Sequence, residues 1–351
     1  MDTSDPYISF DELGRSNHFL DFHNITKKNW FPNLEGKRIL EQAVERIKKE
    51  SRGNDFDCIL GVSGGLDSSY MLHKMVTEYG LKPLLFHVDG GWNSEIAVRN
   101  IKGLIDKLNL ELFTEVINWE EMKEFQLAMF KSGVPHIDVP QDMAFVGALY
   151  KYAEKFKIKT ILNGGNISTE SVLVPLDFLY WPTDMVQVRD ILKRYCNNPM
   201  KTYPFSSIYY TKIWIRYFKR VKVFKPLNFM EFNYESAINE LHDIYGWKPY
   251  GQKHFESRFT RFFEGYWLPT RFGYDMRRSQ FSGLILTNQM TRKEALDKLK
   301  SPPLDNNTIK REFDYVAKKL DIGVSELENY HTMPKKFYWD YANQKLIFRI
   351  G

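Results

Sequence analysis

From residue 57 onward, apolar positions alternate between short continuous runs and longer runs with helical spacing. The continuous runs are residues 58–62, 83–88, 111–116 and 160–162. The runs with helical spacing are residues 69–79, 94–108, 119–131 and 142–156. A continuous apolar run of this length predicts a buried strand, and recurrence every three or four positions predicts a helix. Strands that alternate with helices indicate an α/β fold with a doubly wound parallel sheet.

The regions on either side of this pattern differ from it. Residues 34–51 predict one helix after an irregular start, so residues 1–50 form an N-terminal lead-in and helix. Strand signals fade after residue 200, and aromatic, basic segments with helical spacing take their place. Thr291 and Glu294 form a capping box that opens a helix over residues 291–299, and residues 308–320 predict another. We therefore expect a sheet domain at residues 51–200 and a mainly helical C-terminal region at residues 201–351.

Composition narrows the functional classes. The chain has 351 residues and a net charge of +5, which suits anionic ligands such as nucleotides but does not indicate a nucleic-acid partner. The two cysteines, Cys58 and Cys196, give no disulfide framework, which fits a reducing cytoplasm. No apolar run approaches the roughly 18 residues needed to span a bilayer, and acidic residues stand where a signal peptide would be basic. We expect a cytoplasmic protein without a membrane partner.

Residues 63–69, between the first strand and its helix, read Ser-Gly-Gly-Leu-Asp-Ser-Ser. Gly64 and Gly65 allow backbone N–H groups to approach an anion closely, and the following helix start adds its positive dipole end. The hydroxyl donors of this loop are Ser63, Ser68 and Ser69. Asp67 can hold a magnesium ion. The loop lacks the Gly-Lys-Ser/Thr ending of a Walker A motif. It predicts a site for the phosphates of ATP; the alternative is an ordinary strand-to-helix turn.

Two further polar loops follow predicted strands. Residues 87–92 contain His87 and Asp89, which could contact the nucleotide, although a plain turn explains this segment equally well. The second loop, after the last predicted strand, contains Asn163, Gly164 and Asn166. In a doubly wound fold it lies opposite the phosphate loop, so we expect Gly164 to contact the nucleotide and the two asparagines to contact the substrate.

Other candidates are an acid before a helix and a basic segment. Asp142 is a substrate-binding candidate or only a helix cap. Residues 253–278 contain six Lys or Arg against three acids, which could neutralise a triphosphate or a nucleotide-sugar diphosphate. Lys253 and Arg258 are candidates for stabilising transition-state charge, and Arg277 and Arg278 for binding substrate. The alternative is a solvated basic face.

With these motifs in place, a resemblance can be stated. The loop at residues 63–69 resembles the SGGxDS signature of the PP-loop ATP pyrophosphatases. Nearly end to end, the chain resembles the N-acetyl sugar amidotransferase family of lipopolysaccharide O-antigen and related surface-sugar biosynthesis. Besides that loop, the resemblance is carried by residues 1–6, 8–12, 87–92, 163–168, 253–258 (Lys-His-Phe-Glu-Ser-Arg), 266–271 and 289–295.

The resemblance implies a PP-loop fold of the adenine nucleotide α-hydrolase type and an amidine-forming reaction. ATP, with Mg²⁺, would adenylate the amide oxygen of a sugar N-acetyl group and release pyrophosphate. Ammonia would then expel AMP and leave an acetamidino group on a nucleotide-linked sugar. Neither cysteine lies in a glutaminase pattern, so ammonia would come from a glutaminase subunit similar to that of imidazole glycerol phosphate synthase, with a possible cyclase-like barrel companion.

One departure from the family concerns its N-terminal cysteines. Ser16 and Phe19 stand where family members carry a cysteine pair, and His18 and His23 alone cannot complete a four-ligand site, so we expect no zinc. Two alternatives stay open. One is another PP-loop enzyme, such as a tRNA-modifying or NAD-synthase-like ligase. The other is a non-catalytic, nucleotide-binding scaffold subunit.

Overall fold

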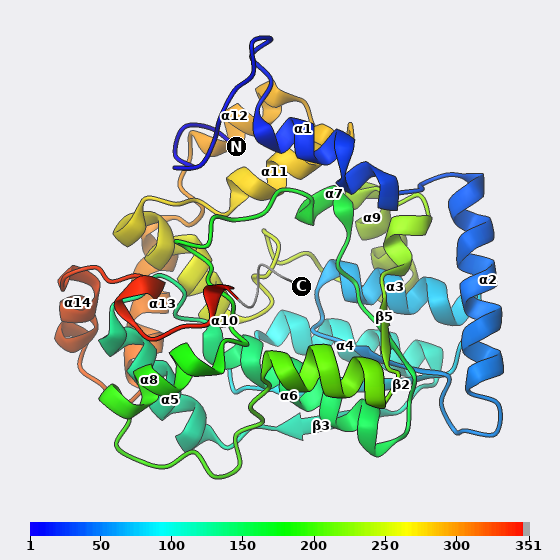
Figure 1. Cartoon of the computed structure of the whole chain (residues 1–351), viewed down its shortest axis with the longest axis horizontal. Helices are drawn as coiled ribbons and strands as arrows, with labels where there is room; N and C mark the ends of the chain where they lie inside the picture. Colours follow the sequence, from blue (N-terminus) through cyan, green and yellow to red (C-terminus); the bar gives the residue numbers. More distant parts are fainter. Residues whose placement is uncertain (347–351) are drawn as a thin grey trace.

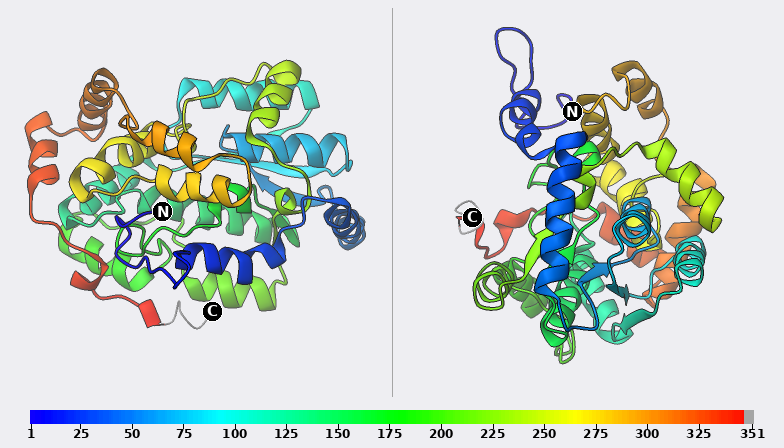
Figure 2. Two further views of the ribbon diagram at one scale, coloured as in Figure 1. Left: turned by 90° about the horizontal axis from the view of Figure 1, so that it is seen from above. Right: turned by 90° about the vertical axis from the view of Figure 1, so that its right-hand side faces the viewer.

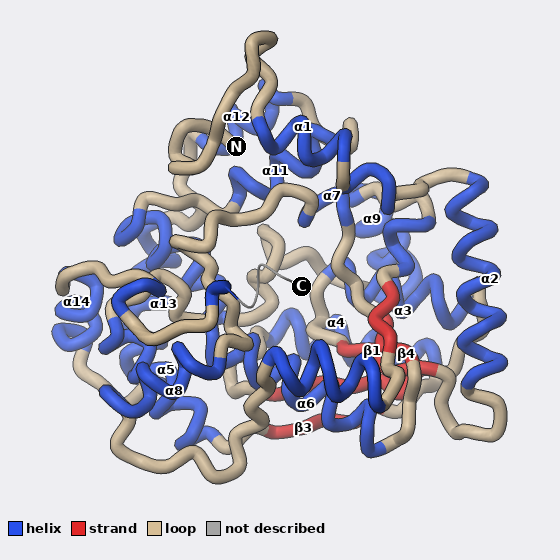
Figure 3. The backbone as a smooth tube through the Cα atoms, in the orientation of Figure 1, coloured by secondary structure: helices blue, strands red, loops and turns tan. Residues whose placement is uncertain are grey.

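The fold is built on one five-stranded sheet in which all paired strands are parallel (Figure 3). The computed structural model describes residues 1–346. The strands, in chain order, are β1 (Cys58–Gly61), β2 (Pro83–Asp89), β3 (Leu112–Val116), β4 (Thr160–Leu162) and β5 (Lys222–Phe224). Their order across the sheet is β3-β2-β1-β4-β5. The chain moves outward from β1 in both directions, which confirms the doubly wound α/β fold.

Helices occupy most of the remaining chain (Figure 1). The α-helices are α1 (Asn17–Asn24), α2 (Leu34–Glu50), α3 (Leu66–Thr77), α4 (Glu95–Leu108), α5 (Trp119–Ser132), α6 (Val139–Lys155), α7 (Ile167–Glu170), α8 (Met185–Tyr195), α9 (Tyr234–Tyr245), α10 (Arg258–Phe262), α11 (Arg277–Leu286), α12 (Arg292–Leu299), α13 (Asn306–Lys319) and α14 (Val324–Thr332). Two π-helices, η2 (Tyr209–Phe218) and η4 (Phe263–Phe272), and the 3-10 helices η1 (Thr26–Asn29), η3 (Pro226–Phe229) and η5 (Tyr338–Asp340) complete the set in the described part. None of the described helices is long and apolar enough to cross a bilayer.

The elements predicted by residue range agree with these bounds to within a few residues. Several others were not predicted, among them helices α1 and α8 and strand β5. Strand β5 lies in the region that we expected to be mainly helical, and it pairs with β4 through Val223 and Ile161. It has only three residues, and Val223 is 48% exposed. A short edge strand with little burial gives almost no periodic signal, which explains the omission. The capping box at Thr291 and Glu294 is present as predicted and opens α12.

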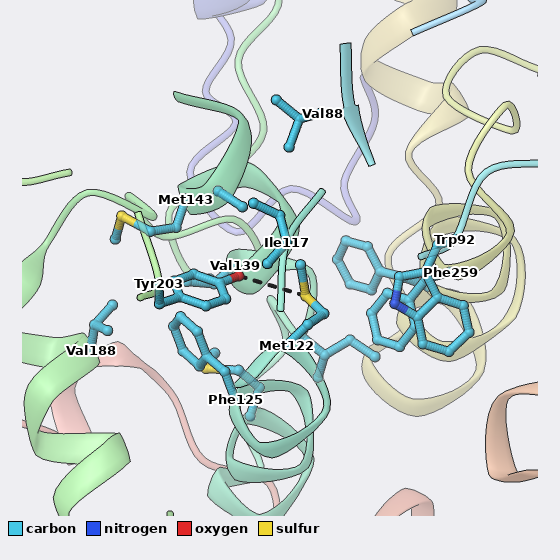
Figure 4. Packing of buried hydrophobic residues seen from close by; sticks show 14 of the residues in the cluster. Val88, Trp92, Ile117, Met122, Phe125, Val139, Met143, Val188, Tyr203 and Phe259 are labelled. Atoms are coloured by element: carbon cyan, nitrogen blue, oxygen red, sulfur yellow. Dashed lines mark hydrogen bonds between the residues drawn. The ribbon is translucent and has the colours of Figure 1, made fainter. Parts of the chain in front are cut away.

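The core lies on both faces of the sheet. Neighbouring residues of β1 point to opposite faces, so Leu60 packs in one buried cluster and Ile59 in the other. The Leu60 cluster includes residues of α2, α3 and α9. The Ile59 cluster is larger and runs through α5 and α6 into the C-terminal helices, where Trp92 and Phe259 lie 4.9 Å apart, ring centre to ring centre (Figure 4). Since the C-terminal helices share this core with the sheet, they are fixed in position at its edge.

The N-terminal segment lies beside helices α11 and α12, and the helices α13 and α14 lie far from α2 (Figures 1 and 2). Figures 1 and 2 show α11, α12 and α1 together on one side and α13 and α14 at the opposite edge from α2. Helix α11 packs on the short helix α7, which directly follows the β4 loop. This packing brings C-terminal segments next to the carboxyl ends of β1 and β4.

Candidate active site

A cavity of about 190 Å³ lies beyond the carboxyl ends of β1 and β4. Residues of three segments line it, within 63–68, 164–170 and 234–256. The first is the predicted phosphate loop and the second is the loop that we expected opposite it. The third comes from the C-terminal region. The cavity therefore lies where doubly wound sheets bind ligands.

The phosphate loop has a conformation that requires glycine and exposes backbone donors. Gly64 has a φ of +79°, and a Cβ on it would lie 2.5 Å from the carbonyl oxygen of Ala97. Gly65 is the N-cap of α3, and no side chain caps this helix. The Leu66 N–H donates to the Tyr250 hydroxyl at 2.9 Å. The next two N–H groups of α3 meet no acceptor among the described residues, so this helix end can bind an anion.

The hydroxyls of the loop divide into two groups. Ser63 accepts from the Gly65 N–H at 3.2 Å, and its Oγ lies 3.4 Å from that of Ser68. Both residues line the cavity. Ser69 is only 1% exposed, its hydroxyl has no partner in the described residues, and it does not line the cavity. The structure thus places Ser63 and Ser68 toward a ligand and Ser69 inside the protein.

Lys253 joins the two loops that face each other across the cavity. Its Nζ lies 2.9 Å from Oδ2 of Asp67 and 2.9 Å from Oε1 of Glu170. It also donates to Thr169 Oγ1 at 2.6 Å. Burial works to lower the pKa of Lys253, but the two carboxylates outweigh it and raise the pKa well above its ordinary value. A permanent cation therefore lies beside the phosphate loop, in direct contact with Asp67.

Glu256 places a carboxylate inside the phosphate loop. Its Oε1 accepts from the Ser63 hydroxyl at 3.0 Å, and a Cβ on Gly65 would lie 2.6 Å from the same oxygen. The other oxygen, Oε2, is buried without a partner among the described residues. Burial raises the pKa of Glu256 above its ordinary value. The carboxylate occupies space that a bound phosphate would approach.

His254 adds an ion pair at the cavity wall. Its Nδ1 donates to Oε1 of Glu264 at 2.9 Å. Burial alone would lower the pKa of His254, but the carboxylate of Glu264 raises it to about 9. The φ of His254 is +68°, a left-handed value that is uncommon outside glycine and often marks functional sites.

Backbone hydrogen bonds to the β2–α4 loop hold this C-terminal segment in place. The Ser94 N–H donates to the Glu256 carbonyl at 2.9 Å, and the Arg258 N–H donates to the Trp92 carbonyl at 2.8 Å. Asn93 and Ser257 form an isolated antiparallel bridge between them. Short antiparallel pairing therefore fixes the position of Lys253 through Glu256 against the sheet.

Sequence reasoning did not single out some residues that shape this site. They are Asn100, Glu170, Tyr250 and Glu256. Asn100 is buried and donates to the Gly64 carbonyl at 3.3 Å, which orients the loop. Glu170 and Glu256 stand inside segments whose motifs we noted, but acids are not expected where anions bind. Tyr250 carries no local signal at all.

His87 and Asp89, expected to contact the nucleotide, do not line the cavity. Both ring nitrogens of His87 are engaged, Nδ1 with the Val62 carbonyl at 2.8 Å and Nε2 with Asn93 at 2.9 Å. Asp89 accepts from the Gly91 N–H at 2.8 Å and lines a separate hollow. In this structure His87 and Asp89 end strand β2, and Asp89 accepts from Gly91 and Asn93 in the loop that leads to α4.

The β4 loop has mixed outcomes. Gly164 lines the cavity, and a Cβ on it would lie 3.0 Å from the Ser68 nitrogen, so this loop presses against the start of α3. Asn163 accepts from the Gly165 N–H at 2.7 Å and does not line the cavity. Asn166 is buried and caps α7 through the Thr169 N–H. The structure gives the two asparagines local structural contacts.

Asp142 and three predicted arginines lie away from the cavity. Asp142 is in the first turn of α6, whose N-cap is Asp138, and its Oδ2 lies 3.2 Å from His136 Nε2. It is therefore not the cap of that helix. Arg258 forms a bidentate pair with Glu312, both contacts at 3.0 Å, and its guanidinium carbon lies 3.3 Å from the ring centre of Tyr315.

The remaining two arginines form ion pairs at and around α11, one of them with the N-terminal segment. Arg277 is buried, pairs with Asp275 at 2.6 Å and donates to the Ser301 carbonyl at 2.8 Å. Arg278 pairs with Asp2 at 2.9 Å. Of the six cations expected to converge on an anion, Lys253 alone lines the cavity among the described residues. Arg258, Arg277 and Arg278 pair instead with the carboxylates of Glu312, Asp275 and Asp2.

The N-terminal segment is ordered by contacts other than metal ligands. Ser16, at an expected cysteine position, caps α1 by accepting from the Phe19 N–H at 3.2 Å. His18 Nε2 lies 2.6 Å from the buried Asp5 carboxylate. Within residues 1–346, no group of three or more His, Cys, Asp or Glu side chains is arranged to hold a metal.

Comparison with known proteins gives one family match. Residues 256–351 match the family model described as "LPS biosynthesis protein WbpG-like, C-terminal domain". This part of the chain is similar to that domain. The match begins at Glu256, so the matched part includes the carboxylate that enters the phosphate loop, while the loop itself precedes it. The description of that domain names lipopolysaccharide biosynthesis, the process that the sequence resemblance implies. No curated protein matches the chain.

Solved structures with a similar arrangement have low sequence identity. NMN synthetase from Francisella tularensis is 14% identical, with a TM-score of 0.39, over 83% of this chain and 98% of its own. NH3-dependent NAD synthetase from Campylobacter jejuni is 15% identical, with a TM-score of 0.34, over 86% and 99%. The U34-tRNA thiolase NcsA from Methanococcus maripaludis is 12% identical, with a TM-score of 0.32, over 88% and 90%. Such values do not indicate a shared activity.

Proposed function

We propose that this chain is an ATP-dependent, AMP- and pyrophosphate-forming amidotransferase that acts on an N-acetyl sugar in lipopolysaccharide biosynthesis. The observation that carries the proposal is the contact of Lys253 with Asp67. Asp67 lies at the start of α3, which no side chain caps and which follows the glycines of the phosphate loop. A helix end with free N–H donors, flanked by a cation, is suited to the tail of a triphosphate. The match of residues 256–351 to a WbpG-like domain supports the biosynthetic context.

Magnesium fits this site as a partner of the triphosphate rather than as a resident ion. Asp67 is the carboxylate of the phosphate loop, lines the cavity and is 17% exposed at its side chain. Mg²⁺ is commonly bound through one or two carboxylates, with substrate phosphates and water as its other ligands. Asp67 would hold the ion, which would neutralise phosphate charge. Because Lys253 now pairs with Asp67, the lysine has to share or release this carboxylate when the ion binds.

The first chemical step would transfer the adenylyl group. The amide oxygen of the N-acetyl group forms a bond to the α-phosphorus, and the bond from that phosphorus to the bridging oxygen of pyrophosphate breaks. Charge builds on the departing pyrophosphate, close to Lys253 and the α3 N-terminus. These groups stabilise developing negative charge without having to reorganise. Adenylation is required because an amide oxygen is otherwise a very poor leaving group.

The second step would use ammonia. Ammonia forms a bond to the activated carbon and loses a proton, and AMP departs with the former amide oxygen, leaving an amidine. We found no glutaminase pattern at Cys58 or Cys196. Cys58 is fully buried, and burial raises the pKa of its thiol well above the ordinary value, so it is a poor nucleophile. Ammonia is therefore proposed to come from a separate glutaminase subunit, in the cytoplasm where ATP is available.

Pyrophosphate release tests the proposal. The purified chain is incubated with ATP, Mg²⁺, ammonium and candidate nucleotide-linked acetamido sugars. Release that needs both the sugar and ammonium is the expected result. Release that needs tRNA or a nicotinate nucleotide instead would assign another PP-loop reaction. ATP binding without any turnover, with the sugars and partner subunits present, would assign a scaffold role. Either of the last two results contradicts the amidotransferase.

A further inference from the structure

The positive charge of this chain is concentrated in one segment, none of whose described residues lines the cavity. Residues 191–230 contain nine Lys or Arg and no Asp or Glu. The whole chain has a net charge of +5, so the other residues together carry −4. The same segment contains ten aromatic residues. Its centre is the π-helix η2, which lies at the periphery of the molecule, light green in Figures 1 and 2.

The exposed face of η2 carries parallel rows of apolar and cationic side chains. Side chains four positions apart on a helix are neighbours, so the spacing of residues defines each row. The apolar rows are Tyr209, Ile213 and Tyr217, and beside them Trp214 and Phe218. These five side chains are between 42% and 68% exposed. The cationic row next to them is Lys212 and Arg216, and Arg220 follows just after the end of the helix. Only Ile215 of this helix is buried, so the helix rests on the protein by its inner row.

Lys212, Arg216 and Arg220 have no carboxylate partner within residues 1–346. Glu154 and Glu50 approach the region, but Glu154 pairs with Lys219 at 2.8 Å and Glu50 pairs with Lys222 at 3.2 Å. Neither contacts Lys212, Arg216 or Arg220. The electrostatic field of these cations is therefore directed toward solvent. An anionic partner would meet uncompensated charge there.

A hollow beside the row adds a place for an anionic group. It has a volume of about 610 Å³, and it is distinct from the candidate active site. Its cationic lining residues are Arg46, Lys212, Arg216 and Lys222. Strand β5 forms its floor through Val223 and Phe224. Four cations around one open hollow suit a phosphate-bearing headgroup.

We propose that η2 and this hollow bind the surface of an anionic phospholipid bilayer. Trp, Tyr and Phe side chains enter the interfacial layer, and adjacent Lys and Arg side chains contact anionic headgroups. The expectation that the chain has no membrane partner depended on the absence of a spanning segment, and surface binding requires none. The proposal is independent of the reaction proposed for the cavity.

Two other classes of partner fit these features less well. The cores of protein interfaces are depleted in lysine and in charge, whereas here each apolar row adjoins cations. Single-stranded nucleic acid needs free aromatic faces for stacking. In this helix Trp214 already stacks on Phe218, with ring centres 5.3 Å apart, and the Nζ of Lys219 lies 5.1 Å from the Trp214 ring centre. A lipid interface can accommodate the stacked aromatic side chains and the adjacent cations without any rearrangement.

Vesicle co-sedimentation of the full chain tests the proposal. The probes are vesicles of phosphatidylcholine alone and vesicles in which about a third of the lipid is phosphatidylglycerol. Each cation near an anionic surface contributes about fivefold to partitioning, so K212Q/R216Q should bind the anionic vesicles roughly 30-fold more weakly. Y217S/F218S should also bind more weakly, by roughly tenfold or more.

Matched controls remove the same chemistry from other helices. Lys310 and Arg311 are exposed cations of α13, and Leu296 and Val324 are exposed apolar residues of α12 and α14. K310Q/R311Q and L296S/V324S should partition like the wild type. Failure of the wild-type chain to sediment with anionic vesicles would overturn the proposal. Equal binding by both η2 variants, or equal loss in the controls, would also overturn it.

Discussion

Glu256 provides the sharpest test of the phosphate loop. A Glu256→Gln substitution keeps the shape of the side chain and an oxygen that can accept from Ser63, 3.0 Å away in the structure. It removes one negative charge from the place where a phosphate would approach. We therefore expect the variant to bind a magnesium-free triphosphate more tightly than the wild type does.

The size of the effect follows from Coulomb's law. Two unit charges about 5 Å apart repel by about 3 kcal/mol at an effective dielectric constant of about 20, and by about 1 kcal/mol in water. The expected gain in affinity therefore lies between roughly fivefold and a hundredfold. Magnesium between the two anions would cancel the repulsion, so the gain should shrink when Mg²⁺ is added. Burial raises the pKa of Glu256, so acidification of the wild type should move its affinity toward that of the variant.

Calorimetric titration with a non-hydrolysable ATP analogue, with and without Mg²⁺, measures this effect. Glu120→Gln is the control, because Glu120 is 72% exposed on α5 and its loss changes the net charge equally. If Glu256→Gln binds the magnesium-free analogue no better than the wild type or the control, the carboxylate does not oppose the phosphate. In that case the ligand does not enter the loop beside Ser63.

Three further predictions concern the other candidate residues. Asp67→Asn should abolish pyrophosphate release while circular dichroism shows an unchanged fold; an active variant would remove Asp67 from the mechanism. Arg258→Met should destabilise the chain by about 1–3 kcal/mol in urea unfolding, since it removes a partner of the buried Glu312, but leave turnover per folded molecule unchanged. A loss of turnover with no loss of stability would indicate that Arg258 takes part in catalysis. The pKa of His254 is raised from 6.5 to about 9, so its pairing with Glu264 stabilises the fold fully below pH 6.5 and is lost as pH rises through 9. Melting temperature should fall over that interval in the wild type and less in Glu264→Gln.

The sheet and the phosphate loop could be predicted from sequence because their signals are local. Strands β1 to β4 are continuous apolar runs, and the loop at residues 63–69 has the glycines and hydroxyls that an anion site needs. The convergence of distant cations could not be predicted this way. Arg258 pairs with Glu312 because α10 packs on α13. Neither segment contains a local sequence signal that predicts this packing. Lys253 reaches Asp67 for the same kind of reason, through tertiary structure.

The unexpected acid in the loop shows why composition alone misleads at such a site. The cations of segment 253–258 predict an anion site, because Lys and Arg side chains bind anions. The position of this segment depends on backbone hydrogen bonds to Trp92 and Ser94, which do not involve side chains. Once the backbone is fixed, the direction of each Cα–Cβ bond is fixed too, and few rotamers remain for a buried side chain. Lys253 then meets Asp67 and Glu256 meets Ser63.

His254 shows what this arrangement costs the chain. A left-handed φ of +68° at a residue with a Cβ is unfavourable by about 1–2 kcal/mol, and glycine would avoid that penalty. A histidine at this position indicates that its side chain contributes something that offsets the strain. Its contact with Glu264 is that contribution, because it ties the turn between Lys253 and Glu256 to η4. The two charged groups that face the phosphate loop are thus held by one strained, ion-paired turn, and the chemistry of the loop depends on a segment far from it in sequence.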